Sequence, residues 1–115
     1  MAFLHIEEND SVLEFGGNIG LTSIQINKKL INPHNHYVIE PLTKVIPKLE
    51  TNKYMNNCKF KIFNGAISDI PLMQKGWNSK PIPDKGIPEG WFKIPTYTYT
   101  EFLEKTNFKF NVIVA

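Results

Sequence analysis

The chain has 115 residues, enough for one domain with a single hydrophobic core. Hydrophobic residues make up 42% and charged residues 21%, proportions typical of a soluble globular protein. No apolar run is long enough to span a bilayer, and residues 1–8 lack the basic start and apolar stretch of a signal peptide. We therefore expect a cytoplasmic protein without membrane contact. The single cysteine, Cys58, excludes an internal disulfide.

The basic residues argue against nucleic acid as a partner. The formal net charge is +2, and all 13 basic residues are lysines spread along the chain. Arginine is the preferred residue for bidentate contacts to phosphate and guanine, so its absence lowers this possibility further. We expect no nucleic-acid partner.

The first half of the chain predicts alternating strands and helices. Residues 11–15 form a short apolar run that ends at a glycine pair, which indicates a buried strand. Apolar residues at helical spacing then predict a helix over about 20–30, ending before Asn32-Pro33. Residues 37–39 form a second strand, and His36 is placed in the turn before it.

A second amphipathic face starts at Leu42, and Pro47 predicts either a break in that helix or a helix that begins after it. Residues 60–63 alternate as a third strand. Residues 71–95 hold five of the eight prolines and both tryptophans, which predicts an irregular excursion with room for a hairpin. A short helix opened by a threonine N-cap (residues 100–105) and an apolar strand (residues 111–115) follow.

This order predicts an α/β fold in a single domain, residues 1–115, with a mostly parallel, Rossmann-like sheet. Ligands of such sheets bind beyond the carboxyl ends of the strands. The first strand ends in Glu14-Phe15-Gly16-Gly17-Asn18-Ile19-Gly20, which lacks the G-x-G-x-x-G pattern of a dinucleotide site in either glycine register. A carboxylate at Glu14 instead suits a ligand with an ammonium or sulfonium group.

Two further strand ends complete the pattern. Glu40 ends the second strand, where a carboxylate can accept hydrogen bonds from both hydroxyls of a ribose. Asn64, Gly65 and Ala66 follow the third strand, where small residues leave room for a flat base whose edge the Ala66 N–H would meet. The three strand ends together predict a site for a nucleoside with a positively charged tail.

These residues resemble the class I methyltransferase pattern. Glu14-x-Gly16-x-x-x-Gly20 is similar to its first motif, Val38-Ile39-Glu40-Pro41 to its second and Asn64-Gly65-Ala66-Ile67-Ser68 to its third. The chain most resembles the FkbM family, which carries a strand-Glu-Pro segment, an Ala-Val/Ile-Ser turn and a later Pro-Thr-x-Thr-like run before a short helix. Here that run is Pro95-Thr96-Tyr97-Thr98, followed by Glu101-Phe102-Leu103, and the resemblance covers about residues 10–115.

The resemblance implies an S-adenosylmethionine-dependent methyltransferase, O-directed, with a small-molecule or glycan acceptor. Glu14 and Gly16, Gly17, Asn18 and Gly20 would hold the methionine part of the cofactor, Glu40 the ribose, and Asn64, Gly65 and Ala66 the adenine. The strand order would be 3-2-1-4, an incomplete class I fold, because Ala115 stands just before the acidic residue that follows the family's fourth strand. We therefore expect a truncated cofactor-binding half, with no catalytic base assigned.

Several alternatives stay open. The chain is either an enzyme or a catalytically incomplete remnant that binds cofactor or a partner, and an NAD-type oxidoreductase fragment is disfavoured by the glycine pattern. A metal site is not expected, because His34 and His36 have no further ligand cluster. Cys58 fits a structural thiol. The aromatic residues of 77–99 are expected to cover the sheet, and an acceptor or partner surface is the alternative for Trp77, Trp91, Phe92, Tyr97 and Tyr99. The strand 111–115 would be an exposed edge, which predicts self-association.

Overall fold

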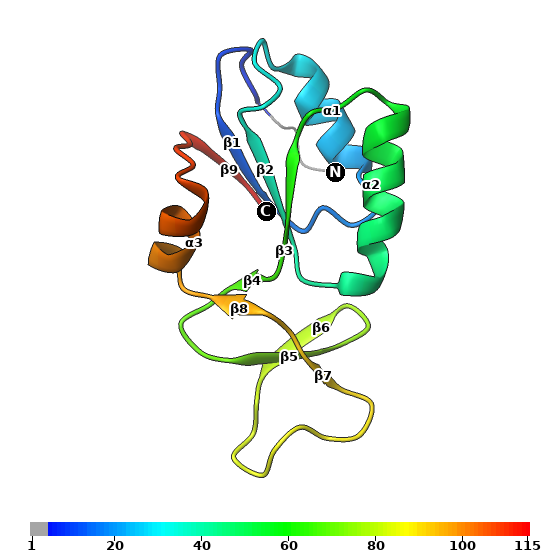
Figure 1. Ribbon diagram of the computed structural model, residues 1–115, viewed down its shortest axis with the longest axis vertical. Helices are drawn as coiled ribbons and strands as arrows, with labels where there is room; N and C mark the ends of the chain where they lie inside the picture. The colour runs from blue at the N-terminus through cyan, green and yellow to red at the C-terminus, as the bar shows by residue number, and fades with distance from the viewer. Residues whose placement is uncertain (1–4) are drawn as a thin grey trace.

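A computed structural model describes residues 5–115 of the chain. Residues 1–4, the first part of the segment in which no signal peptide is expected, lie outside the described residues. Its centre is a parallel four-stranded sheet in the order β3-β2-β1-β9 (Figure 1). The strands are β1 (Val12–Phe15), β2 (His36–Glu40), β3 (Lys61–Asn64) and β9 (Val112–Val114). The α/β class and the predicted strand order are therefore confirmed, and the arrangement is consistent with a Rossmann-like sheet.

Three helices cover the two faces of this sheet (Figure 1). Helices α1 (Leu21–Lys29) and α2 (Ile46–Met55) pack on one face, where Val12 contacts Ile26 and Val38 contacts Leu49. Helix α3 (Tyr99–Thr106) packs on the other face through Phe102, which is fully buried. Successive side chains of a strand point to opposite faces, so each short strand contributes to both cores. No helix of the described part of the chain combines the length and apolarity needed to cross a bilayer.

Local sequence explains where two helices begin. Pro47 lies in the first turn of α2, where its missing N–H costs nothing, and a 3-10 turn (Thr43–Val45) precedes it. The helix therefore begins one residue before Pro47 and not after it, and the 3-10 turn leads into it without a break. Helix α3 begins earlier than predicted, because its N-cap is Thr98, whose side chain accepts from the Glu101 N–H while the Glu101 carboxylate accepts from the Thr98 N–H.

The excursion after β3 forms small sheets of its own below the main sheet (Figure 1). Strands β5 (Leu72–Lys75) and β6 (Asn78–Pro81) form the expected hairpin, and β7 (Phe92–Lys93) pairs with β5 on the other side. A parallel pair, β4 (Ala66–Ile67) and β8 (Thr96–Tyr97), joins the excursion to the domain.

The aromatic residues of this region divide into two groups. Tyr97 packs against Phe63 of β3 with ring centroids 4.9 Å apart, as expected for a residue that covers the sheet. Trp77 and Phe92 are 65% and 72% exposed, so for them that expectation is wrong. They lie on the hairpin and on β7, which extend away from the main sheet, so the sheet offers them no contact.

Candidate functional site

The predicted site residues follow the carboxyl ends of three neighbouring parallel strands. Glu14 lies opposite Val38, and Glu40 lies opposite Asn64. Because Val38 and Glu40 are two residues apart in one strand, Glu14 and Glu40 project from the same face of the sheet. The fold therefore brings the two acids and the segment after β3 to one edge, as predicted.

Glu40 is joined to the glycine turn that follows β1. Its Oε1 accepts a hydrogen bond from the Asn18 N–H at 2.7 Å, and its Oε2 accepts one from the Leu42 N–H at 2.8 Å. The residue is only 3% exposed, so both bonds are shielded from water. A carboxylate offers about four acceptor positions, and these two bonds leave about two for other donors.

The four predicted site residues of the glycine turn, Gly16, Gly17, Asn18 and Gly20, have different roles. A Cβ on Gly17 would lie 2.2 Å from Val38 Cγ1, and one on Gly20 would lie 2.8 Å from Leu49 Cδ1. These two glycines are required by the packing of the turn on β2 and α2. Gly16 and Asn18 are exposed and have positive φ angles of 80° and 54°. A Cβ on Gly16 would meet nothing within 4 Å, so this is the part of the turn that a ligand can approach.

The carboxylate of Glu14 is used inside the protein. It is 2% exposed and accepts from Ser23 Oγ of α1 and from His36 Nε2 of β2, both at 3.0 Å. Asn27 Nδ2 lies 3.2 Å from His36 Nδ1, and the Asn27 Oδ1 accepts from the Lys59 N–H, which fixes the orientation of the amide. His36 Nδ1 is then the acceptor and Nε2–H is the donor to Glu14. Direct contact between Glu14 and a ligand stays a prediction, whereas its internal bonds show a positioning role.

Sequence reasoning missed His36, which it placed in a turn. The residue begins β2 and has no exposed surface. The signal was available in the alternation of the strand, because His36, Val38 and Glu40 occupy every second position and lie on one face.

The segment after β3 anchors the excursion. Asn64 Nδ2 donates to the Glu40 carbonyl at 2.9 Å, and Gly65 is packed so closely that a Cβ would lie 3.1 Å from the Pro95 carbonyl oxygen. The Ala66 N–H donates to that same oxygen at 2.8 Å. The expectation that this N–H meets the edge of a base is therefore wrong, because the N–H is already used in a hydrogen bond where β4 pairs with β8.

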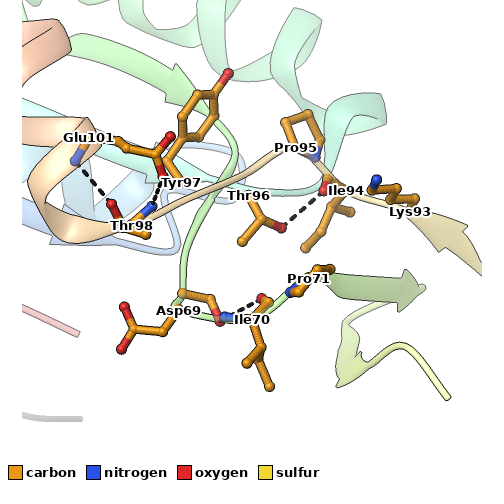
Figure 2. Close-up of a pocket in the computed structure, with 11 residues that line it drawn as sticks. Asp69, Ile70, Pro71, Lys93, Ile94, Pro95, Thr96, Tyr97, Thr98 and Glu101 are labelled. Carbon is orange, nitrogen blue, oxygen red and sulfur yellow. Dashed lines mark hydrogen bonds between the residues drawn. The ribbon is translucent and has the colours of Figure 1, made fainter. Parts of the chain in front are cut away.

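A cleft of about 560 Å³ lies beside this segment, between residues 68–71 and 93–98 (Figure 2). Its volume is within the range of small-molecule sites. Ile70, Pro71 and Pro95 supply apolar surface, and Asp69 and Glu101 supply carboxylates. Hydrogen bonds from the Thr98 backbone and side chain hold the pKa of Glu101 below its ordinary value, so it is ionised at neutral pH. The composition of the excursion gave no sign of this cleft, which exists only because two distant segments meet.

Within residues 5–115 no group of three His, Cys, Asp or Glu side chains is placed to hold a metal ion. Comparison with family models, with curated proteins and with solved structures finds no match to this chain.

Proposed function

We propose that this chain binds S-adenosylmethionine at the carboxyl edge of its sheet and forms the cofactor-binding part of an FkbM-type methyltransferase. The acceptor would be an oxygen of a small molecule or glycan. The supporting observation is the contact between Glu40, at the end of β2, and the open turn after β1 through the Asn18 N–H. It places a carboxylate with unused acceptor positions beside backbone that a ligand can approach.

The residues fit the cofactor in separate ways. Glu40 would accept from the ribose hydroxyls, and the exposed Gly16 and Asn18 would face the methionine part. Gly17 and Gly20 shape the turn, while Glu14 holds α1 against β2 through Ser23 and His36. Asn64 borders the site through its bond to the Glu40 carbonyl. The adenine would lie along residues 64–65 and would not receive a hydrogen bond from the Ala66 N–H.

The bound cofactor would supply an activated methyl group on a sulfonium. The protein's part would be to hold its ligand and exclude water, because alignment of donor and acceptor provides much of the rate. The cleft at residues 68–71 and 93–98 adjoins the same edge and is the natural place for an acceptor. Its carboxylates, Asp69 and Glu101, can accept hydrogen bonds from hydroxyl groups of a glycan.

One observation favours the second candidate, binding without turnover. Glu14 is nearly fully buried and its carboxylate already accepts from Ser23 and His36, so this acid serves the fold and is not free to act as a catalytic base. A protein that binds the adenosyl ligand but gives no methyl transfer to any tested hydroxyl compound would support this alternative over the enzyme.

The deciding experiment is calorimetric titration with S-adenosylhomocysteine and, separately, with NAD. We expect saturable binding of the first ligand only. Replacing Glu40 by Gln substitutes an amide for a carboxylate and should weaken binding by about 1–3 kcal/mol. Glu104→Gln, at an exposed position on α3, is the matched control. Binding of NAD alone would overturn the proposal, and an unchanged affinity in Glu40→Gln with an intact fold would remove Glu40 from the site.

A further inference from the structure

A second pocket lies at the opposite, amino-terminal edge of the sheet. It has a volume of about 410 Å³ and is formed by the residues before β2, the end of α2 and the loop that leads into β3. The charged and aromatic side chains that line it are His34, Glu50, Lys53, Tyr54, Lys59 and Lys61. The predicted cofactor edge lies at the other ends of the same strands, so the two sites are separate.

Positive charge predominates in this pocket. Lys53 and Lys59 stand against one carboxylate, Glu50, while the Lys61 ammonium lies over the Tyr37 ring, 5.6 Å from its centroid, and across residues 5–115 no lysine forms an ion pair within 4 Å. Helix α2 ends here at Met55, and the carbonyl end of a helix carries about half a negative charge. That partial charge offsets only part of the excess, which remains about +0.5. An anion is the ligand that this excess would attract.

The backbone at Lys53, in α2, and at Lys59, in the following loop, is held in place by hydrogen bonds. The Cys58 N–H donates to the Lys53 carbonyl at 3.0 Å, and the Lys59 N–H donates to Oδ1 of the buried Asn27 at 2.9 Å. The Lys53 ammonium lies over the Phe60 ring, 5.8 Å from its centroid. A ligand would therefore meet lysines on an ordered backbone and would not have to order a mobile loop.

The potential of nearby lysines also acts on Cys58, which lines the pocket. Burial raises the pKa of the Cys58 thiol, and the charges of Lys28 and Lys53 act in the opposite direction. Lys28 belongs to the last turn of α1, so lysines of two helices contribute positive potential at the thiol. This agrees with a site whose field favours anions.

We propose that this pocket binds a small phosphorylated ligand with an aromatic group. Lys53, Lys59 and His34 would contact the phosphate, because an ammonium suits phosphate as a compact point charge and a dianion gains more from it than a carboxylate does. The ring of Tyr54, 83% exposed at the pocket, would pack against the aromatic part.

The test uses phenyl phosphate, which contains no adenosine and so does not report on the cofactor edge. It is titrated into the ¹⁵N-labelled full chain at low salt, with inorganic phosphate as a second probe. We expect saturable shifts of amides in residues 53–61, no shifts in residues 16–20, and weaker binding of inorganic phosphate. Absence of saturation at millimolar concentration, or shifts spread over all surface lysines, would overturn the proposal.

Variants separate the pocket from general charge. The double variant Lys53→Ala with Lys59→Ala should bind phenyl phosphate at least tenfold more weakly, while Lys53→Arg with Lys59→Arg should retain most of the affinity. Lys85→Ala with Lys109→Ala removes the same charge from exposed positions outside the pocket and should change little. Equal losses in the two alanine pairs would contradict a defined site.

Two further binding measurements define the chemical class of the ligand. Tyr54→Ala should weaken the binding of phenyl phosphate and leave the binding of inorganic phosphate unchanged. Equal effects on both affinities would remove the aromatic part of the proposal. Vesicles containing phosphatidic acid present the same phosphomonoester on a lipid. Binding to these vesicles without binding to phenyl phosphate would assign the pocket to a membrane surface and overturn the small-ligand proposal.

Discussion

The backbone N–H of Asn18 donates to the side chain of Glu40 across 22 residues of sequence, at 2.7 Å. This bond connects the turn after β1 to the end of β2, so the shape of the turn and the position of the acid depend on each other. Asn18 has a positive φ angle of 54°, and Gly16 and Gly20, also at positive φ, complete the turn that points its N–H toward the carboxylate. Affinity for the proposed cofactor should therefore respond to changes in the turn as well as to changes in Glu40.

Two glycine substitutions should separate packing from ligand access. Gly17→Ala places a methyl group 2.2 Å from Val38 Cγ1, and this overpacking should lower the free energy of unfolding by about 1–3 kcal/mol. Gly16→Ala has space for its methyl group. Only the strain of an alanine in the left-handed conformation should therefore lower the free energy of unfolding, by about 1–2 kcal/mol. Urea unfolding measures both.

The same pair should differ in ligand binding. Gly16→Ala should weaken the binding of S-adenosylhomocysteine markedly, because the new methyl group occupies the open side of the turn. If Gly16→Ala binds this ligand as well as the unmodified chain does, the cofactor does not approach the turn from that side.

Removing His36 should destabilise the protein strongly. His36→Leu leaves the Glu14 carboxylate buried with only Ser23 as a donor, and depriving a buried group of its hydrogen bond costs about 1–3 kcal/mol, and more when the group is charged. Glu14→Gln retains an acceptor oxygen for His36 and should cost less. Chemical denaturation of both variants and of the double variant measures the coupling. Additive losses would show that the two side chains do not interact energetically.

Stability should decrease at alkaline pH. Burial raises the pKa of both Cys58 and Tyr37, and both groups are neutral when protonated. The folded state therefore binds these protons more tightly than the unfolded state, so the stability is complete below the ordinary thiol pKa and is lost as pH rises above about 8.5. Unfolding free energies measured from pH 7 to 10 should fall, and Cys58→Ala should flatten the first part of that decline. A flat profile for the unmodified chain would contradict the prediction.

The strand β9 should support self-association. It pairs with β1 on one side only within the described sheet, and Ile113 is 57% exposed. Unpaired backbone beside an apolar side chain is a template for pairing with a second copy. Light scattering after size-exclusion chromatography should show a concentration-dependent dimer, and Ile113→Lys should shift it toward monomer. A monomer at all concentrations would disprove this.

Short-range patterns were sufficient for much of the fold. Alternation over 37–39 and 60–63, a glycine pair after an apolar run and proline punctuation each depend on neighbours in the chain, and they predicted the parallel sheet with its strand order. They also predicted Glu40 at a strand end, because the carboxyl ends of parallel strands share one edge. The hairpin in the excursion followed from turn residues in the same way.

Long-range contacts settled the rest. The bonds of Glu14 to His36 and of Lys59 to Asn27 span 22 and 32 residues, and local periodicity carries no information on such partners. Only the packing of α1 on the sheet turned Glu14 into a buried acceptor, and only the pairing of β4 with β8 occupied the Ala66 N–H. The lysine pocket is of the same kind, since His34, Lys53 and Lys59 meet through the folding of three separate elements. Hydrogen bonds and charges act over a few ångströms of space, and the fold alone sets which residues come that close.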